Sequence, residues 1–205
     1  MTILIIDYGL GNLTSILNAL KLLKIKAKIS NNIEEIKKAD KLILPGVGAF
    51  EEGMKNLDKF GLIGVLNEEV LVKKKPLLGI CLGMQLICKK SYENGEHQGL
   101  GWIDAEVVKF KFDKENLRIP HIGWNDVKCD LNSELFQGGD KVQTFYFVHS
   151  FYLKPINKEI INGTCNYGID FCASIQKENI FATQFHPEKS QTEGLEILKK
   201  FSQIN

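Results

Sequence analysis

The chain of 205 residues has no excess of either charge, because 26 lysines and arginines stand against 25 acidic residues and leave a formal net charge of +1. Nucleic-acid and acidic membrane surfaces attract proteins mainly through an excess of basic side chains, which is lacking here. Long apolar runs are lacking too. The segment from Met1 to Asp7 has neither the basic start nor the length of a signal peptide, and no stretch could span a bilayer. We expect a cytoplasmic protein without nucleic-acid or membrane partners.

Cysteine pairs are also absent. The five cysteines are odd in number, widely spaced and contain no C-x-x-C pair, which argues against a disulfide framework and against a zinc site. Unpaired thiols suit a reducing compartment. No repeat or low-complexity linker divides the chain, so we predict a single domain over residues 1–205, with neither a metal nor another cofactor.

The first half of the chain alternates short apolar runs with segments of helical spacing. The runs at residues 2–6, 27–29, 41–44 and 77–80 are predicted strands. The segments at 13–23 and 33–38 are predicted helices, and the segment at 57–72 is predicted to form one or two helices. Gly61 and Gly64 are weak points in the last helix. This alternation predicts an α/β fold with a mostly parallel central sheet flanked by helices.

After residue 101 the pattern changes to short β-rich runs joined by turns. We predict strands at residues 107–112, 126–129, 144–148, 165–167, 172–176 and 180–184. A helical segment follows only at 192–201. The C-terminal half is therefore predicted to be an antiparallel extension of the parallel sheet, closed by one last helix.

A cysteine between two glycines follows the strand predicted at residues 77–80. The spacing Gly79-x-Cys81-x-Gly83, directly before a helical segment, is typical of a nucleophile on a sharp strand-to-helix turn. The free N–H groups of such a turn favour a thiolate. The pattern predicts acyl transfer through the Cys81 sulfur. Taken alone, however, it also fits a buried and inert cysteine.

The loop after the strand predicted at 41–44 contains Gly46, Val47 and Gly48. Glycines at the carboxyl end of such a strand allow the backbone to approach a ligand closely. In enzymes with a nucleophile elbow, the residue after the nucleophile, here Leu82, supplies one oxyanion donor, and a loop of this kind supplies the second. We assign the second donor to this loop, although a simple tight turn would explain the same residues.

His186 and Glu188 lie at the end of the last predicted strand, with Pro187 between them. Residues two apart in an extended chain point the same way, and we expect the proline to prevent a helix there. The carboxylate can then orient the imidazole while the imidazole accepts the proton of Cys81.

The other histidines have less favourable surroundings for catalysis. His97 lies in a polar segment and is expected to be exposed. His121 and His149 lie among apolar residues, where we expect structural hydrogen bonds. His186 is the only histidine with a carboxylate two residues on.

Taken together, the segments at 45–48, 79–85 and 184–188 resemble the motifs of class I glutamine amidotransferases, whose fold is flavodoxin-like and whose triad is Cys-His-Glu. Further segments, at 7–12, 120–125, 146–151 and 189–190, are similar to the glutaminase subunits of imidazole glycerol phosphate synthase. The resemblance covers nearly the whole chain. It implies Cys81 as nucleophile, His186 as general base and then acid, and Glu188 as the residue that orients His186.

The resemblance also implies further site residues. Gln85 would hold the amino-acid end of glutamine, and the other residues implied in oxyanion stabilisation or glutamine binding are Gly46, Val47, Gly48, Leu82, Ser150 and Phe151. Asn12, Trp124 and Lys189 would face a partner. Each has a plainer alternative: Gln85 on a helix surface, Trp124 in the core, and Lys189 exposed without a role.

The implied partner is a (β/α)8 cyclase subunit of the HisF type, paired one-to-one as a heterodimer. Glutamine would be hydrolysed to glutamate through a thioester, and the ammonia would be passed on for synthesis of imidazole glycerol phosphate and AICAR in histidine biosynthesis. Protonated ammonia is no nucleophile, so we expect a closed path and an oxyanion loop that stays misaligned until the partner is loaded. Three alternatives remain open: a glutaminase subunit of an anthranilate-type or sugar-modifying synthase, a stand-alone γ-glutamyl thiol hydrolase, and a non-catalytic flavodoxin-like module.

Overall fold

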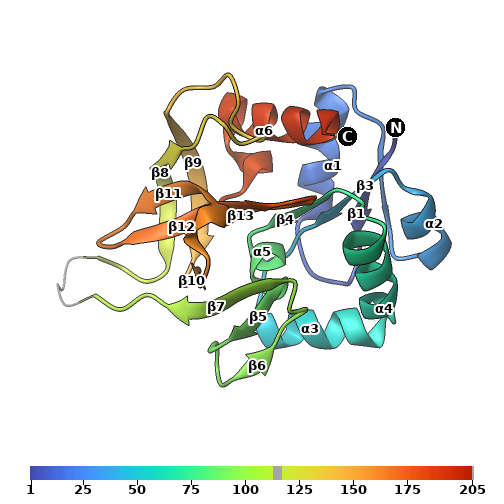
Figure 1. The fold of residues 1–205 in the computed structure, drawn as a ribbon, viewed down its shortest axis with the longest axis horizontal. Coiled ribbons are helices and arrows are strands. Elements are labelled where there is room, and N and C mark those ends of the chain that lie inside the picture. Colours follow the sequence, from blue (N-terminus) through green and yellow to red (C-terminus); the bar gives the residue numbers. More distant parts are fainter. Residues whose placement is uncertain (113–116, 205) are drawn as a thin grey trace.

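The computed structural model describes residues 1–112 and 117–204; the rest of the predicted domain, residues 113–116 and 205, lies outside this description. A single mixed sheet crosses the molecule, with helices on both faces of its parallel part (Figure 1). The helices are α1 (Leu13–Leu22), α2 (Ile33–Lys38), α3 (Phe50–Lys59), α4 (Leu62–Asn67), α5 (Leu82–Leu86) and α6 (Gln191–Gln203). A π-helical turn lies at Glu68–Val72, and 3-10 helices lie at Lys158–Ile160 and Pro187–Lys189.

The parallel part of the sheet has the strand order β2-β1-β3-β4-β13. Its strands are β1 (Ile3–Ile6), β2 (Ala27–Ser30), β3 (Lys41–Leu44), β4 (Leu77–Ile80) and β13 (Ile180–Thr183). The sheet continues from β13 through β12-β10-β7-β5-β6, and β11, β8 and β9 form a branch next to β12. These strands are β5 (Cys88–Ser91), β6 (His97–Gln98), β7 (Ile103–Lys109), β8 (His121–Cys129), β9 (Val142–His149), β10 (Phe151–Pro155), β11 (Ile161–Asn166) and β12 (Asp170–Lys177).

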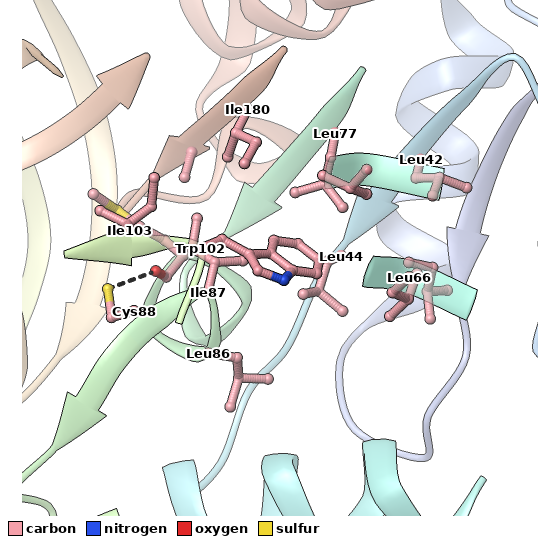
Figure 2. Packing of buried hydrophobic residues seen from close by; sticks show 14 of the residues in the cluster. Leu42, Leu44, Leu66, Leu77, Leu86, Ile87, Cys88, Trp102, Ile103 and Ile180 are labelled. Atoms are coloured by element: carbon pink, nitrogen blue, oxygen red, sulfur yellow. Dashed lines mark hydrogen bonds between the residues drawn. The ribbon is translucent and has the colours of Figure 1, made fainter. Parts of the chain in front are cut away.

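The apolar core lies on both faces of the parallel strands, because successive residues of a strand point to opposite faces. In β1, Leu4 and Ile6 pack in one cluster, whereas Ile3 and Ile5 pack in the other. Figure 2 shows part of the first cluster, in which the Trp102 indole lies among leucine and isoleucine side chains. The continuous apolar runs of the sequence are thus explained by burial on both faces.

The observed elements confirm the predicted α/β class and its antiparallel extension, with two corrections. The helical segment predicted at 57–72 begins earlier, at Phe50, which corrects its start. Its division at Gly61, whose φ is +67°, confirms that glycine as a weak point, whereas Gly64 lies inside α4. The prediction left out the first turns of this segment, although Phe50, Met54 and Leu57 have the i, i+4, i+7 spacing of a helix.

The second correction concerns β13, which was predicted within the antiparallel extension. This strand pairs in parallel with β4 and antiparallel with β12, so it joins the two parts of the sheet. Thr183 pairs with Ile80, and both strands end at the same edge. The segments after β4 and after β13, which carry Cys81 and His186, therefore emerge side by side.

Candidate active site

Cys81 lies on a strained turn between β4 and α5. Its φ of +54° and ψ of −106° are outside the regions that non-glycine residues favour. Two residues further on, only glycine fits at position 83, because a Cβ on Gly83 would lie 1.8 Å from the backbone oxygen of Leu44. The Cys81 N–H donates to the Thr183 carbonyl at 2.8 Å, which ties the turn to the end of β13. This is the geometry of a nucleophile elbow.

His186 and Glu188 meet through a 3-10 turn rather than along an extended strand. β13 ends at Thr183, and Pro187 begins the 3-10 helix Pro187–Lys189. The expectation that the proline would prevent a helix is therefore wrong, because proline is well tolerated at the first helical position. The turn places Nδ1 of His186 2.8 Å from Oε1 of Glu188, and both side chains are almost fully buried.

Cys81 and Glu188 both raise the pKa of His186. Burial by itself would lower this pKa, but the hydrogen bonding and charge of Cys81 and of Glu188 outweigh burial. The pKa of His186 is therefore raised from 6.5 to about 10. Among the described residues, the buried Nε2 of His186 has no hydrogen-bond partner. The hydrogen bond between a nucleophile and its base is often long or poorly aligned before substrate binds.

A cavity of about 350 Å³ opens over Cys81. Six of the predicted glutamine-site residues line it: Val47, Gly48, Leu82, Gln85, Ser150 and Phe151. Gly46 lies behind this wall, where a Cβ would be 2.1 Å from Oη of Tyr8 and 2.9 Å from Cβ of Leu82. The cavity wall also contains Glu93, which no sequence pattern singled out, and His149, for which only a structural role was expected.

The two predicted sources of oxyanion donors are joined to each other. The N–H of Leu82 donates to the carbonyl oxygen of Gly46 at 3.3 Å. The base of the loop is fixed as well, since the buried Tyr8 hydroxyl donates to the Pro45 carbonyl at 2.6 Å. In this structure, therefore, the loop carbonyl occupies the donor that an oxyanion would need.

Gln85 is not a helix-surface residue. Its side chain is buried, and Nε2 donates to the carbonyl of Phe151 at 3.2 Å and to Oε1 of Gln184 at 3.1 Å. Gln184 was part of the recognised motif but was given no role. Its own Nε2 lies 3.7 Å from the Cys81 sulfur. In the sequence, a role for Gln184 was indicated only by its position at the end of the strand predicted at 180–184, two residues before His186.

The candidate partner-facing residues are exposed. Trp124 is 47% exposed, so the alternative that it is a core residue is wrong. Its ring centroid lies 6.0 Å from that of Tyr146, and Nζ of the exposed Lys189 lies 5.8 Å from the same Tyr146 ring. Asn12 is exposed and caps α1, where its Oδ1 accepts from the N–H of Ser15.

His121 and His149 form a buried pair, as expected for structural histidines. Nδ1 of His121 lies 3.0 Å from Nε2 of His149, whose Nδ1 lies 2.8 Å from the Phe151 carbonyl oxygen. Burial lowers the pKa of His121 from 6.5 to about 4 and that of His149 to about 3. Both rings are neutral at physiological pH, and His121 contacts the His149 ring that lines the cavity.

Residues 1–112 and 117–204 include no helix with the length and apolar character that a membrane span requires. They also contain no group of three or more histidine, cysteine, aspartate or glutamate side chains placed to hold a metal ion.

Comparison with known proteins places this geometry in a family. Residues 4–204 match the family model described as glutamine amidotransferase class-I. The chain is 52% identical over 202 residues to imidazole glycerol phosphate synthase subunit HisH 1 of Campylobacter jejuni (strain RM1221), covering 98% of this chain and 100% of that protein. It is 46% identical to subunit HisH 2 of Pseudomonas aeruginosa PAO1, covering 98% and 99%.

Solved structures of lower sequence identity share the fold. PurLQS from Thermotoga maritima has a TM-score of 0.75 at 13% identity, covering 98% of this chain and 97% of that one. The glutaminase domain of Trypanosoma brucei CTPS with bound acivicin has a TM-score of 0.70 at 14% identity, covering 100% and 95%. The chain therefore belongs to the class I glutamine amidotransferase family and is an enzyme of that class. Within the family it is of the HisH type, the glutaminase subunit of imidazole glycerol phosphate synthase.

Proposed function

We propose that Cys81, His186 and Glu188 are the triad with which this chain hydrolyses glutamine to glutamate and ammonia. The observation that carries this proposal is that Cys81, which lines the cavity, and the hydrogen-bonded pair of His186 and Glu188 follow two strands that pair in parallel and end at the same edge. A buried carboxylate that binds Nδ1 of an imidazole leaves Nε2 free to exchange a proton with the nucleophile.

The reaction follows from this arrangement. Nε2 of His186 accepts the proton of the Cys81 thiol, and the sulfur attacks the side-chain carbonyl carbon of glutamine. Collapse of the tetrahedral intermediate breaks the C–N bond, and the imidazolium returns its proton to the departing nitrogen, which leaves as ammonia. Water, deprotonated by His186, then attacks the glutamyl thioester, and release of glutamate restores the thiol.

The cavity walls offer matching groups for the amino-acid end of glutamine. The Glu93 carboxylate lines the cavity and can balance the α-ammonium, while its Oε2 accepts from the N–H of Phe50 at 2.7 Å. Gln85 uses its amide nitrogen internally, so its oxygen is the end that would accept from the same ammonium. Ser150 and Phe151 would bind mainly through their backbone groups.

Ammonia must reach its acceptor unprotonated, which requires a docked partner. We propose a one-to-one complex with a (β/α)8 cyclase subunit of the HisF type, which docks against the face that carries Asn12, Trp124 and Lys189 and uses the ammonia to form imidazole glycerol phosphate and AICAR. Trp124 supplies an exposed aromatic side chain, a residue type that is enriched at protein interfaces, and Lys189 supplies an exposed charge that an acidic residue of the partner can complement. The five free, buried thiols and the pathway support a cytoplasmic location.

Covalent labelling tests the triad. A glutamine-analogue electrophile should modify one thiol per chain, at Cys81, and Cys81→Ala should abolish both the labelling and glutamine hydrolysis. Cys88→Ala, which removes a fully buried thiol away from the cavity, is the matched control and should label normally. Modification at another cysteine would overturn the assignment. Co-purification with the cyclase subunit tests the pathway.

A further inference from the structure

A short hydrogen-bond chain connects the wall of the glutamine cavity to the Cys81 sulfur. The carbonyl oxygen of Phe151 accepts from Nε2 of Gln85 at 3.2 Å. The same Gln85 nitrogen donates to Oε1 of Gln184 at 3.1 Å, and Nε2 of Gln184 lies 3.7 Å from the sulfur. Gln184 itself has no exposed surface.

The direction of this chain is fixed at its far end. A backbone carbonyl only accepts hydrogen bonds, so the Gln85 amide must turn its NH2 group toward Phe151. The second hydrogen of that NH2 group then requires an acceptor, which sets the oxygen of Gln184 on this side. If the Gln184 amide were flipped, its NH2 group would face the NH2 group of Gln85, and its oxygen would face the sulfur. The NH2 group of Gln184 is therefore directed at Cys81.

An N–H group directed at sulfur stabilises a thiolate more than a thiol, because hydrogen bonds to charged acceptors are the stronger ones. Resting on the proposed function of Cys81, we propose that Gln184 is a positioning residue that holds the sulfur in its reactive orientation and links it to the glutamine-binding residue Gln85. It touches the nucleophile but not the reacting bond of glutamine. Movement of Gln85 or Phe151 when glutamine binds is transmitted to the sulfur through this one amide.

A structural role alone would not need this amide. The backbone of Gln184 is already held, since its N–H donates to the carbonyl of Ala173 at 2.8 Å. A side chain of equal length without polar atoms would fill the same space among buried residues. Replacement of the amide by such a side chain therefore separates positioning from packing.

The test uses iodoacetamide, a small electrophile that does not need the glutamine-binding groups. Gln184→Met keeps the length of the side chain but removes the donor to sulfur, and Gln184→Glu keeps the acceptor for Gln85 but places a carboxylate oxygen at the sulfur. We expect Cys81 alkylation to slow roughly tenfold or more in both variants, because the thiolate loses a hydrogen bond to a charged acceptor, which is stronger than one to a neutral acceptor. Cys81→Ala supplies the background reaction of the other thiols.

Two further variants distinguish coupling from local damage. Gln85→Met does not touch the sulfur, yet it should slow iodoacetamide alkylation several-fold, since Gln184 loses the donor that orients it. Ser202→Ala removes a buried hydroxyl in α6, away from the cavity, that donates to the Lys199 carbonyl, and it should leave alkylation unchanged. In the complex with the cyclase, Gln184→Met should lower kcat for glutamine with little change in KM.

If Gln184→Met folds and has the same alkylation rate and the same kcat as the wild type, Gln184 does not have the proposed role. If that variant does not fold, the same result in Gln184→Glu, or an unchanged rate in Gln85→Met, would overturn the proposed role. Failure of the proposed function has a different signature, namely glutamine hydrolysis that survives in Cys81→Ala.

Discussion

The N–H of Leu82 donates to the carbonyl oxygen of Gly46 at 3.3 Å, so the first predicted oxyanion donor is occupied by the loop that should supply the second. A negatively charged oxygen cannot enter while this bond holds. The loop is anchored on one side by the Tyr8–Pro45 hydrogen bond and flanked on the other by Gly48, whose φ of +122° only glycine adopts readily. A peptide rotation within the loop, with little movement of its anchor, would free the Leu82 donor.

We therefore predict that the isolated chain hydrolyses glutamine slowly and that the cyclase subunit activates it. Loss of one oxyanion donor typically lowers kcat by about 10²–10³-fold, which sets the scale of the expected activation. Steady-state glutaminase assays with and without the partner and its ligand measure this ratio. Full activity of the lone chain would contradict the gating role of the loop and leave the triad assignment intact.

Glu188→Gln should lower kcat by about 10²–10⁴-fold, because the amide no longer enforces the tautomer in which Nε2 of His186 accepts the thiol proton. The measurement is glutamine turnover by the assembled complex. Glu178→Gln is the control: Glu178 is exposed and pairs only with Lys74 at the surface, so its loss should be neutral. Near-normal turnover of Glu188→Gln would mean that the carboxylate is dispensable.

Gly83→Ala should destabilise the fold severely, since its Cβ would lie 1.8 Å from the rigid backbone oxygen of Leu44. Gly64→Ala is the matched control, because nothing lies within 4 Å of the added Cβ inside α4. It should stabilise the protein by up to about 1 kcal/mol through helix propensity. Urea unfolding of the two variants measures both effects. Equal stabilities would show that the elbow tolerates a side chain there.

The His121–His149 pair should make stability fall with acid. Both pKa values are lowered in the folded state, to about 4 and about 3, so the unfolded chain binds protons first as the pH drops below 6.5. The contribution of the pair is complete above pH 6.5 and is lost progressively toward pH 3. Each proton taken up preferentially by the unfolded chain costs about 1.4 kcal/mol per pH unit. In urea unfolding across this range, a folded His149→Gln variant should lose less stability than the wild type; an equal slope would contradict this account.

Lys189→Ala should weaken binding to the cyclase subunit without altering the labelling of Cys81 in the isolated chain. The lysine is exposed beside the Tyr146 ring, and we expect it to meet an acidic residue of the partner. The effect should shrink as salt is added, because exposed charges are screened. Titration by calorimetry at low and high salt measures it. Lys199→Ala, whose lysine pairs with Glu196 within α6, is the control and should bind normally.

The strands around the elbow could be predicted because their signals are local. Residues 41–44 and 77–80 are short apolar runs bounded by proline and glycine, and the structure has strands at those positions. The contact between His186 and Glu188 was expected for the wrong reason, since a 3-10 turn, not strand alternation, brings the side chains together. The spacing along the chain was enough to predict that these two side chains meet. The path of the backbone depended on a contact with another strand, since the N–H of His186 donates to the carbonyl of Tyr146.

By itself, then, the sequence determined the α/β class, the elbow at Cys81 and the family, because apolar periodicity, glycine spacing and short motifs are properties of neighbouring residues. Only the tertiary structure decided that β13 inserts next to β4, that the Leu82 donor is occupied by Gly46, and that Gln184 connects Gln85 to the sulfur. Each of these depends on groups from separate strands and loops meeting at specific distances and angles, and no pattern along the chain specifies such geometry.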